Sequence, residues 1–431
     1  MNATKQQTSS AEKPTLTGWL LFLLGMSFFL SAIPSLRPSL LGLSLHPYLG
    51  VLALLSCVVL FTRAPHKVSH SLGGWGGIFV VALLLSYLAN GDLTGSLRDI
   101  SKWLIMLATF SFVAIGVRNS ADLRWGVIGL IFGVTLIGLR AMIIYQANPT
   151  VYLSPMPGIG SRNNYSLWAI APFGLALWSY TQPFTSKRKR FFLLFCMFFM
   201  AVPLAMSLSR ASVALLVLNA VLVFAIRRSL RMVMLITIVV LVAISVTEFF
   251  DFGIRIQERM NTLREGGTGS DHLRREIIEQ GISIFIDNPI FGVSVHKLGG
   301  LLGRAVRGGG GLSSHNLFVD LLAGTGLLGF LSFMMCSLKL FGRWVKSRKA
   351  VISAWKDHAG YMPVLLPLIA IQGLTSNEVI FCPAIMMGLG LCFSAANHAI
   401  SQETSEYQTE RGYSPMKAEQ VNPELVANVL R

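Results

Sequence analysis

The sequence predicts an all-α polytopic membrane protein of about 12 transmembrane helices, with one large loop between helices 9 and 10. Three properties of the chain indicate this class. Of its 431 residues, 53% are hydrophobic and only 13% are charged, and the mean hydropathy is +0.61. Because soluble domains carry about 25% charged residues, we take the bilayer as the solvent of this protein.

The individual spans are predicted from apolar runs of about 20 residues, the length that crosses a hydrocarbon core roughly 30 Å thick. Such runs lie at 15–33, 46–62, 74–90, 101–117, 125–146, 165–182, 190–208, 211–226, 231–248, 316–340, 361–377 and 379–397. The stretch from Lys189 to Ile226 would be about 57 Å long as a single helix. We therefore expect it to turn near Ser207–Arg210.

The orientation follows from the distribution of Lys and Arg, which concentrate in cytoplasmic loops. With the N-terminus inside, the inner loops hold sixteen basic residues and the short outer loops hold four. Membrane orientation thus explains most of the net charge of +16, and we expect no nucleic-acid partner. The same topology places the long loop outside and both termini in the cytoplasm.

Along the chain we expect a cytoplasmic tail at 1–14, helices 1–9 within 15–248, the outer loop at 249–315, helices 10–12 within 316–398 and a disordered cytoplasmic tail at 399–431. The five cysteines are scattered through the spans. They give neither a disulfide framework nor a metal-ligand spacing. We expect neither a bound metal nor a cofactor.

Basic residues near the outer face oppose the general charge pattern and need another explanation. They are Arg98, Lys102, Arg140, Arg162 and Arg210. Each alone could be a snorkelling or ion-paired side chain. Together they suggest an anionic ligand, and a lipid-linked diphosphate fits because guanidinium groups bind phosphate oxygens bidentately.

Within the outer loop, residues 271–286 predict a helix that ends before Pro289. One stripe of this helix carries Arg274, Ile278, Ile282 and Phe285. Arg274 therefore shares the face that we expect to pack, and should point towards the membrane body. Arg275 is the less favoured candidate.

The following segment contains Gly299, Gly300 and Gly303 and the run 308–311. We expect it to be too rich in glycine to hold one rigid conformation. Two interpretations remain open: a lid over a bound substrate, or a disordered loop without a role.

His315 follows two serines, Ser313 and Ser314, which are plausible N-caps for the tenth span. If that helix begins at the outer surface, its partial positive charge disfavours imidazolium. His315 would then be neutral and could serve as a general base towards a sugar hydroxyl. The alternative is a cap or surface histidine. Gly324, Gly326 and Gly329 further along the same helix indicate close helix packing.

The pattern of His315-Asn316, nine residues, and Gly326-Leu327-Leu328-Gly329 resembles the signature of the O-antigen ligase and polymerase superfamily. Three further features resemble it in the same order: Ser209-Arg210, Arg274 fifteen residues before Pro289, and the run 287–293. Two positions depart from the family pattern. Ile278 replaces an aromatic residue, and Gly292-Val293-Ser294 replaces Gly-Val-Gly.

The resemblance implies a metal-independent glycosyltransferase of GT-C-like fold in the bacterial inner membrane, with its active site facing the periplasm. Arg210 and Arg274 would bind the diphosphate of an undecaprenyl-diphosphate-linked polysaccharide, and His315 would activate the acceptor. Further candidates for diphosphate binding are Arg140, Arg162 and Arg275. Asn316, Arg98 and Lys102 would support the site.

Within this superfamily we expect an O-antigen ligase, which transfers a preassembled polysaccharide to a hydroxyl of lipid A-core. A chain with one long loop and no extra C-terminal domain favours this activity. The alternatives are an O-antigen or exopolysaccharide polymerase and a protein O-oligosaccharyltransferase. From another class, a polysaccharide flippase would show internal repeats and charges spread through its spans, which the sequence does not show.

Overall fold

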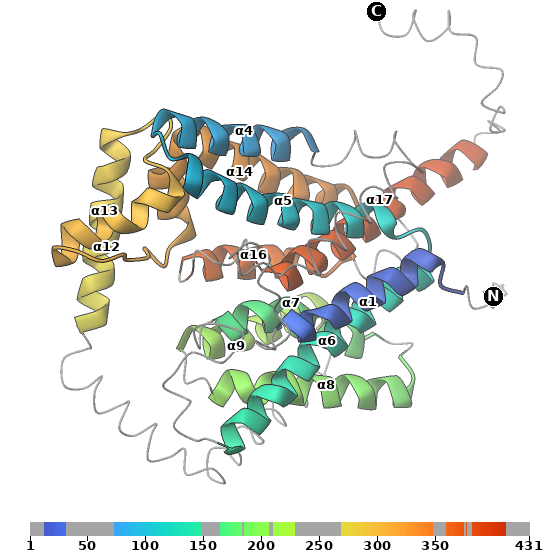
Figure 1. Ribbon diagram of the computed structural model, residues 1–431. Coiled ribbons are helices and arrows are strands. Elements are labelled where there is room, and N and C mark those ends of the chain that lie inside the picture. Colours follow the sequence, from blue (N-terminus) through green and yellow to red (C-terminus); the bar gives the residue numbers. More distant parts are fainter. Residues whose placement is uncertain are drawn as a thin grey trace, which may run out of the picture.

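The computed structural model describes residues 13–31, 73–147, 164–182, 185–206, 210–228, 269–347, 359–374, 376 and 382–410. These residues form twelve α-helices and no β-strand. Ten of them form an elongated bundle, and two, α12 (Gly269–Asp287) and α13 (Val295–Arg307), lie together at one end of it (Figure 1).

Ten of the predicted spans coincide with bundle helices: α1 (Leu16–Ser31), α4 (Gly73–Ala89), α5 (Leu93–Gly116), α6 (Ser120–Ala147), α7 (Asn164–Tyr180), α8 (Lys187–Met206), α9 (Arg210–Arg227), α14 (Leu317–Ser347), α16 (Met362–Gly373) and α17 (Pro383–Glu410). The predicted runs 46–62 and 231–248 lie outside the described residues. The stretch 189–226 is divided between two helices, α8 and α9, whereas the expected turn falls on residues 207–209, outside the described part.

Helix α17 is longer than we expected. It continues to Glu410, so the first twelve residues of the predicted disordered tail are helical. The stretch 401–410 contains Glu and Gln and neither Gly nor Pro. Such residues lose little side-chain entropy in a helix, and the helix can therefore extend beyond its apolar part.

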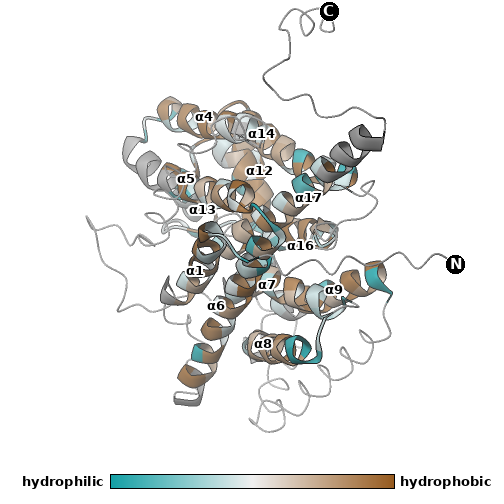
Figure 2. Cartoon of the chain, turned by 90° about the vertical axis from the view of Figure 1, so that its right-hand side faces the viewer, coloured by the Kyte–Doolittle hydropathy of each residue, from teal (hydrophilic) through white to brown (hydrophobic). Residues whose placement is uncertain are grey.

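Three described helices are long and apolar enough to cross a membrane: Ser120–Ile144 within α6, Leu317–Ser347 and Pro383–Ser401 within α17. Shorter apolar helices occur within α1, α4, α5, α9 and α16. Figure 2 shows hydrophobic residues along most of α4 and α6. By length and composition, these helices belong to a multi-pass membrane protein.

Glycines allow the helices α1 and α6 to approach closely. A Cβ on Gly25 would lie 2.3 Å from the carbonyl carbon of Gly129, and one on Gly133 would lie 2.0 Å from the Gly25 oxygen. Buried Asp122 fixes the same pair at its other end, because its carboxylate accepts from the Thr15 backbone N–H at 2.8 Å. Small residues are the usual means of close helix contact in lipid.

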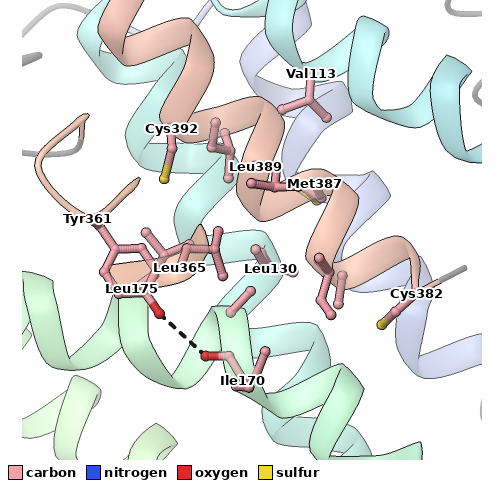
Figure 3. Close-up of a cluster of buried hydrophobic side chains, with 14 of the residues drawn as sticks. Val113, Leu130, Ile170, Leu175, Tyr361, Leu365, Cys382, Met387, Leu389 and Cys392 are labelled. Carbon is pink, nitrogen blue, oxygen red and sulfur yellow. Dashed lines mark hydrogen bonds between the residues drawn. The ribbon is translucent and has the colours of Figure 1, made fainter. Parts of the chain in front are cut away.

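Helices α7, α16 and α17 meet in an apolar core that includes Leu175, Leu365 and Met387 (Figure 3). Tyr361, just before α16, is fully buried there. Its hydroxyl donates to the carbonyl oxygen of Ile170 on α7 at 3.4 Å (Figure 3). A hydroxyl without access to water is thus satisfied within the protein.

Helix α14 is broken at Gly326, which has φ 66° and ψ −170°. The sequence indicated a continuous helix with glycines facing another helix, and this interpretation is wrong at Gly326. A Cβ there would lie 2.2 Å from the Ile290 carbonyl oxygen. The glycine makes room for the turn after α12.

Candidate active site

The helix predicted at 271–286 is confirmed as α12, Gly269–Asp287, but its buried face differs from the predicted stripe. Ile277 is 3% exposed, whereas Ile282 is 46% exposed. Leu273 and Ile284 pack with Ile277 against the loop core. Gly281 decides this rotation, since a Cβ on it would lie 2.4 Å from Val319 Cγ1 on α14.

Arg274 therefore does not lie on the packing face. It is exposed, one position from the buried stripe. Arg275 forms an exposed ion pair with Glu279 one turn later, with 2.9 Å between Nε and Oε1. The nearby carboxylate gives Arg275 a local partner and supports Arg274 as the better anion ligand of the two.

The turn after α12 is held against α14 by backbone hydrogen bonds. The Val293 N–H donates to the Ala323 carbonyl at 2.9 Å, and the Leu327 N–H donates to the Pro289 carbonyl at 2.8 Å. The second bond follows directly from the break at Gly326, because Leu327 begins a new helical segment with its N–H free of an intrahelical partner. These two bonds hold the turn after α12 against α14 at two positions one helical turn apart.

The turn between α4 and α5 also anchors the segment after α12, a contact that the sequence did not predict. Ser294 donates to the buried Asp92 carboxylate at 2.9 Å, and the Asn90 side chain donates to the Gly292 carbonyl at 2.9 Å. The Lys297 ammonium donates to the Asn90 carbonyl. The turn residues Asn90-Gly91-Asp92 between two apolar runs are the signal that could have identified this anchor.

Ser294 stands where the family pattern has glycine, and the structure shows what the serine does. Its φ is 69°, a conformation that glycine adopts more readily. The hydroxyl bonds Asp92 and also accepts from the Lys297 N–H at 3.2 Å, which caps helix α13. These hydrogen bonds offset the backbone strain.

The prediction that the glycine-rich segment lacks one rigid conformation is wrong, because residues 295–307 form helix α13. Its own residues Leu298 and Leu302 are buried, and Gly308 ends the helix with φ 73°. The chain then returns along the helix, where the Leu312 N–H donates to the Gly299 carbonyl at 2.9 Å. Whether this unit moves as a lid stays a prediction.

Asn316, rather than Ser313 or Ser314, caps the N-terminus of α14. Its side-chain oxygen accepts from the backbone N–H groups of Phe318 at 3.0 Å and Val319 at 3.3 Å. Ser314 instead accepts from the Asn316 N–H at 2.9 Å, which fixes the cap residue. The predicted serine caps were placed too early because the chain reverses at His315.

His315 lies between these two polar residues in the left-handed region, with φ 50°. A non-glycine residue there is strained by about 1–3 kcal/mol, and such strain is concentrated at functional sites. The side chain is exposed. The residue precedes the first turn of α14 and is accessible to a substrate.

The surroundings of His315 favour neutral imidazole. Desolvation by neighbouring protein atoms lowers the pKa of His315 below its usual range, and the positive charge of Arg274 lowers it further. The direction agrees with the sequence-based expectation. The structure attributes it to desolvation and to Arg274, rather than to the helix terminus alone.

Residues 195–334 match the O-antigen ligase family. The superfamily indicated by the sequence motif is thereby confirmed for this part of the chain. No curated protein matches the chain.

The matched residues 195–334 include Arg210, Arg274, Arg275, His315 and Asn316. Within this range, desolvation and the positive charge of Arg274 both lower the pKa of His315. Arg210 is the first residue of α9, and its side chain is outside the described part.

The other candidates precede the matched residues 195–334. Lys102 and Arg140 are half-buried on α5 and α6. Arg98 lies in α5 with its side chain outside the described part, and Arg162 falls outside the described residues altogether. Their part in one anion site stays a prediction.

Proposed function

We propose that the protein is an O-antigen ligase that transfers a preassembled polysaccharide from undecaprenyl diphosphate to a hydroxyl of lipid A-core. The observation that carries the proposal is an accessible histidine with a strained backbone conformation inside the family-matched residues, together with an exposed arginine whose charge contributes to lowering its pKa. His315 can supply a proton acceptor and Arg274 a fixed positive charge. Glycan transfer from a lipid diphosphate can use both, one on the acceptor hydroxyl and the other on the leaving diphosphate.

In the proposed reaction, His315 accepts the proton of the acceptor hydroxyl, and the resulting oxygen attacks the anomeric carbon of the donor sugar. The bond between that carbon and the phosphate oxygen breaks, and its electron pair leaves with the diphosphate. Attack opposite to the leaving group inverts the anomeric carbon. The imidazolium formed at His315 later returns its proton to solvent.

Arg274 and Arg210 stabilise the negative charge that develops on the departing diphosphate, because a guanidinium group binds two phosphate oxygens and stays charged. Arg140, Arg162 and Arg275 are further candidates for this role. Arg98 and Lys102 would add positive charge, and Asn316 would hold the backbone after His315 by capping α14. Desolvation and the charge of Arg274 both lower the pKa of His315, which favours the neutral imidazole that a general base needs.

We further propose twelve spans in the bacterial inner membrane, both termini in the cytoplasm and the loop 249–315 in the periplasm as the catalytic segment. Contacts between distant segments support this topology. The α4–α5 turn, assigned to the outer side from the charge pattern, bonds Gly292 and Ser294 of the long loop. Two segments in direct contact must lie on the same side of the bilayer.

The decisive experiment measures glycan attachment in a strain that lacks the gene and carries plasmid variants. His315→Ala should abolish lipopolysaccharide bearing O-antigen while the protein stays at normal abundance in the membrane. His296→Ala is the matched control, since His296 is an exposed histidine on α13 and should retain attachment. Normal modification by His315→Ala would remove the proposed base.

The same deletion strain separates a ligase from a polymerase or a flippase. Loss of a ligase should leave long polysaccharide on the carrier lipid, fully polymerised but unattached. Single repeat units on the carrier would indicate a polymerase, and carrier-linked glycan held on the cytoplasmic side would indicate a flippase. Either result would contradict the proposed reaction.

A further inference from the structure

We propose that the C-terminal half of α12 and the turn after it are inserted among the lipids of the adjacent leaflet, although the sequence assigns them to an aqueous loop. Four large apolar side chains there are exposed: Ile282 by 46%, Ile286 by 66%, Ile290 by 62% and Phe291 by 38%. A contiguous exposed apolar patch marks an interaction surface. Its position identifies lipid acyl chains as the partner.

One face of α12 changes from charged to apolar along the helix. Residues 275, 279, 282 and 286 recur at the spacing of a single helix face. The first two are the charged, ion-paired Arg275 and Glu279, with relative side-chain exposures of 82% and 60%. The last two are isoleucines. A face that is charged over one half and apolar over the other offers only its second half to an apolar partner.

The exposed apolar patch after α12 continues onto the surface of α14. The Leu327 N–H bonds the Pro289 carbonyl, so Ile290 and Phe291 lie beside the second segment of that helix. From there Leu327, Leu328, Leu331 and Leu338 are all exposed along α14, a helix apolar enough to cross a membrane. The patch therefore extends a surface that faces lipid.

The orientation of α12 is consistent with this placement. Figure 1 shows α12 running across the end of α4 and α14 rather than along them. A helix in this position lies near the bilayer surface, where amphipathic helices bury their apolar side chains to a depth of about 5–10 Å. Asp287 follows Ile286 about 100° further round the helix, which leaves the carboxylate free to face the head groups.

Insertion of this corner would give α12 two attachments, to α14 and to the bilayer itself. Arg274 lies on the charged half of the same helix, outside the lipid. The depth of α12 would then set the height of Arg274 above the membrane, where the diphosphate of a lipid-linked donor lies. This last consequence rests on the proposed function, whereas the lipid contact does not.

The test uses nitroxide labels on cysteines introduced singly into the full chain, reconstituted in vesicles of phosphatidylethanolamine and phosphatidylglycerol. Collision with oxygen reports lipid, and collision with a water-soluble nickel chelate reports water. Ile286→Cys and Ile290→Cys should favour oxygen several-fold, as should the reference Leu331→Cys on α14. Glu279→Cys is the matched control on the same face and should favour the nickel chelate.

The chain without an added cysteine measures the background from the five native cysteines. Labels at 286 and 290 that collide with nickel as often as the label at 279 would overturn the proposal. Labels shielded from both reagents would also overturn it, because they would show that protein, such as a second copy of the chain, covers the patch. No donor or acceptor is needed, so failure here would leave the proposed function standing.

Discussion

Replacing Gly326 with alanine should lower the free energy of unfolding by about 2–4 kcal/mol. The backbone angles at this residue, φ 66° and ψ −170°, are almost confined to glycine, and another residue costs about 1–3 kcal/mol there. The new Cβ would also lie 2.2 Å from the carbonyl oxygen and 2.4 Å from the carbonyl carbon of Ile290. Because these are backbone atoms, the whole turn must move.

Moving the turn breaks the 2.8 Å hydrogen bond between the Leu327 N–H and the Pro289 carbonyl, which contributes about 1 kcal/mol. Gly342→Ala is the matched control, because Gly342 lies on the same helix with no heavy atom within 4 Å of its Cβ. That substitution should be neutral or stabilising by up to about 1 kcal/mol.

The assay is thermal unfolding of the purified proteins in detergent, followed by tryptophan fluorescence, together with glycan attachment in the deletion strain. Gly326→Ala should unfold several degrees below wild type and lose attachment, while Gly342→Ala should keep both properties. Equal unfolding temperatures for the two variants would refute the view that glycine at position 326 is required for the close contact with Ile290.

Three further predictions concern the proposed site. Because the pKa of His315 is lowered, activity should persist as the pH falls below the usual histidine range and disappear only when the imidazole becomes protonated. Arg274→Gln removes one cause of the lowering, so the acidic limb of the pH–rate profile should move to higher pH; an unmoved limb would contradict the coupling. Arg274→Lys keeps the charge and should leave that limb in place, but turnover should fall at least about tenfold because an ammonium lacks the planar pair of donors with which a guanidinium binds phosphate bidentately; normal donor turnover would argue against diphosphate binding. Asn316→Asp keeps an acceptor for the Phe318 and Val319 N–H groups and should stay folded and active, whereas Asn316→Ala should lose about 1 kcal/mol of stability in thermal unfolding, and identical melting of the two would exclude the capping role.

The bundle helices could be predicted from the sequence because the bilayer sets both their length and their composition. Helix α13 could not, because three of its thirteen residues are glycines, each of which lowers helix propensity by about 1 kcal/mol. Burial of Leu298 and Leu302 and the cap at Ser294 outweigh that cost. Both are consequences of tertiary packing.

In the candidate site, too, some features follow from the local sequence and others from tertiary contacts. His315 and Arg274 could be predicted from their residue types and motif, whereas their supports depend on contacts between distant parts of the chain. Asp92 is 202 positions from its partner Ser294, and no local pattern joins them. The buried face of α12 was predicted one position away from the observed one, because Gly281 was not recognised as the point of closest contact with Val319.

The contacts between α12 and α14 connect the two helices that position Arg274 and His315. Gly281 meets Val319, Val293 bonds Ala323, and Pro289 bonds Leu327, so contacts follow one another along α14. Arg274 and His315 lie at the same end of this series, seven residues before Gly281 and four before Val319 respectively. Neither is held by the contacts directly. Their separation therefore depends on the relative angle of the two helices, which the contacts fix, and a change at the opposite end of the series should reach the site through that angle.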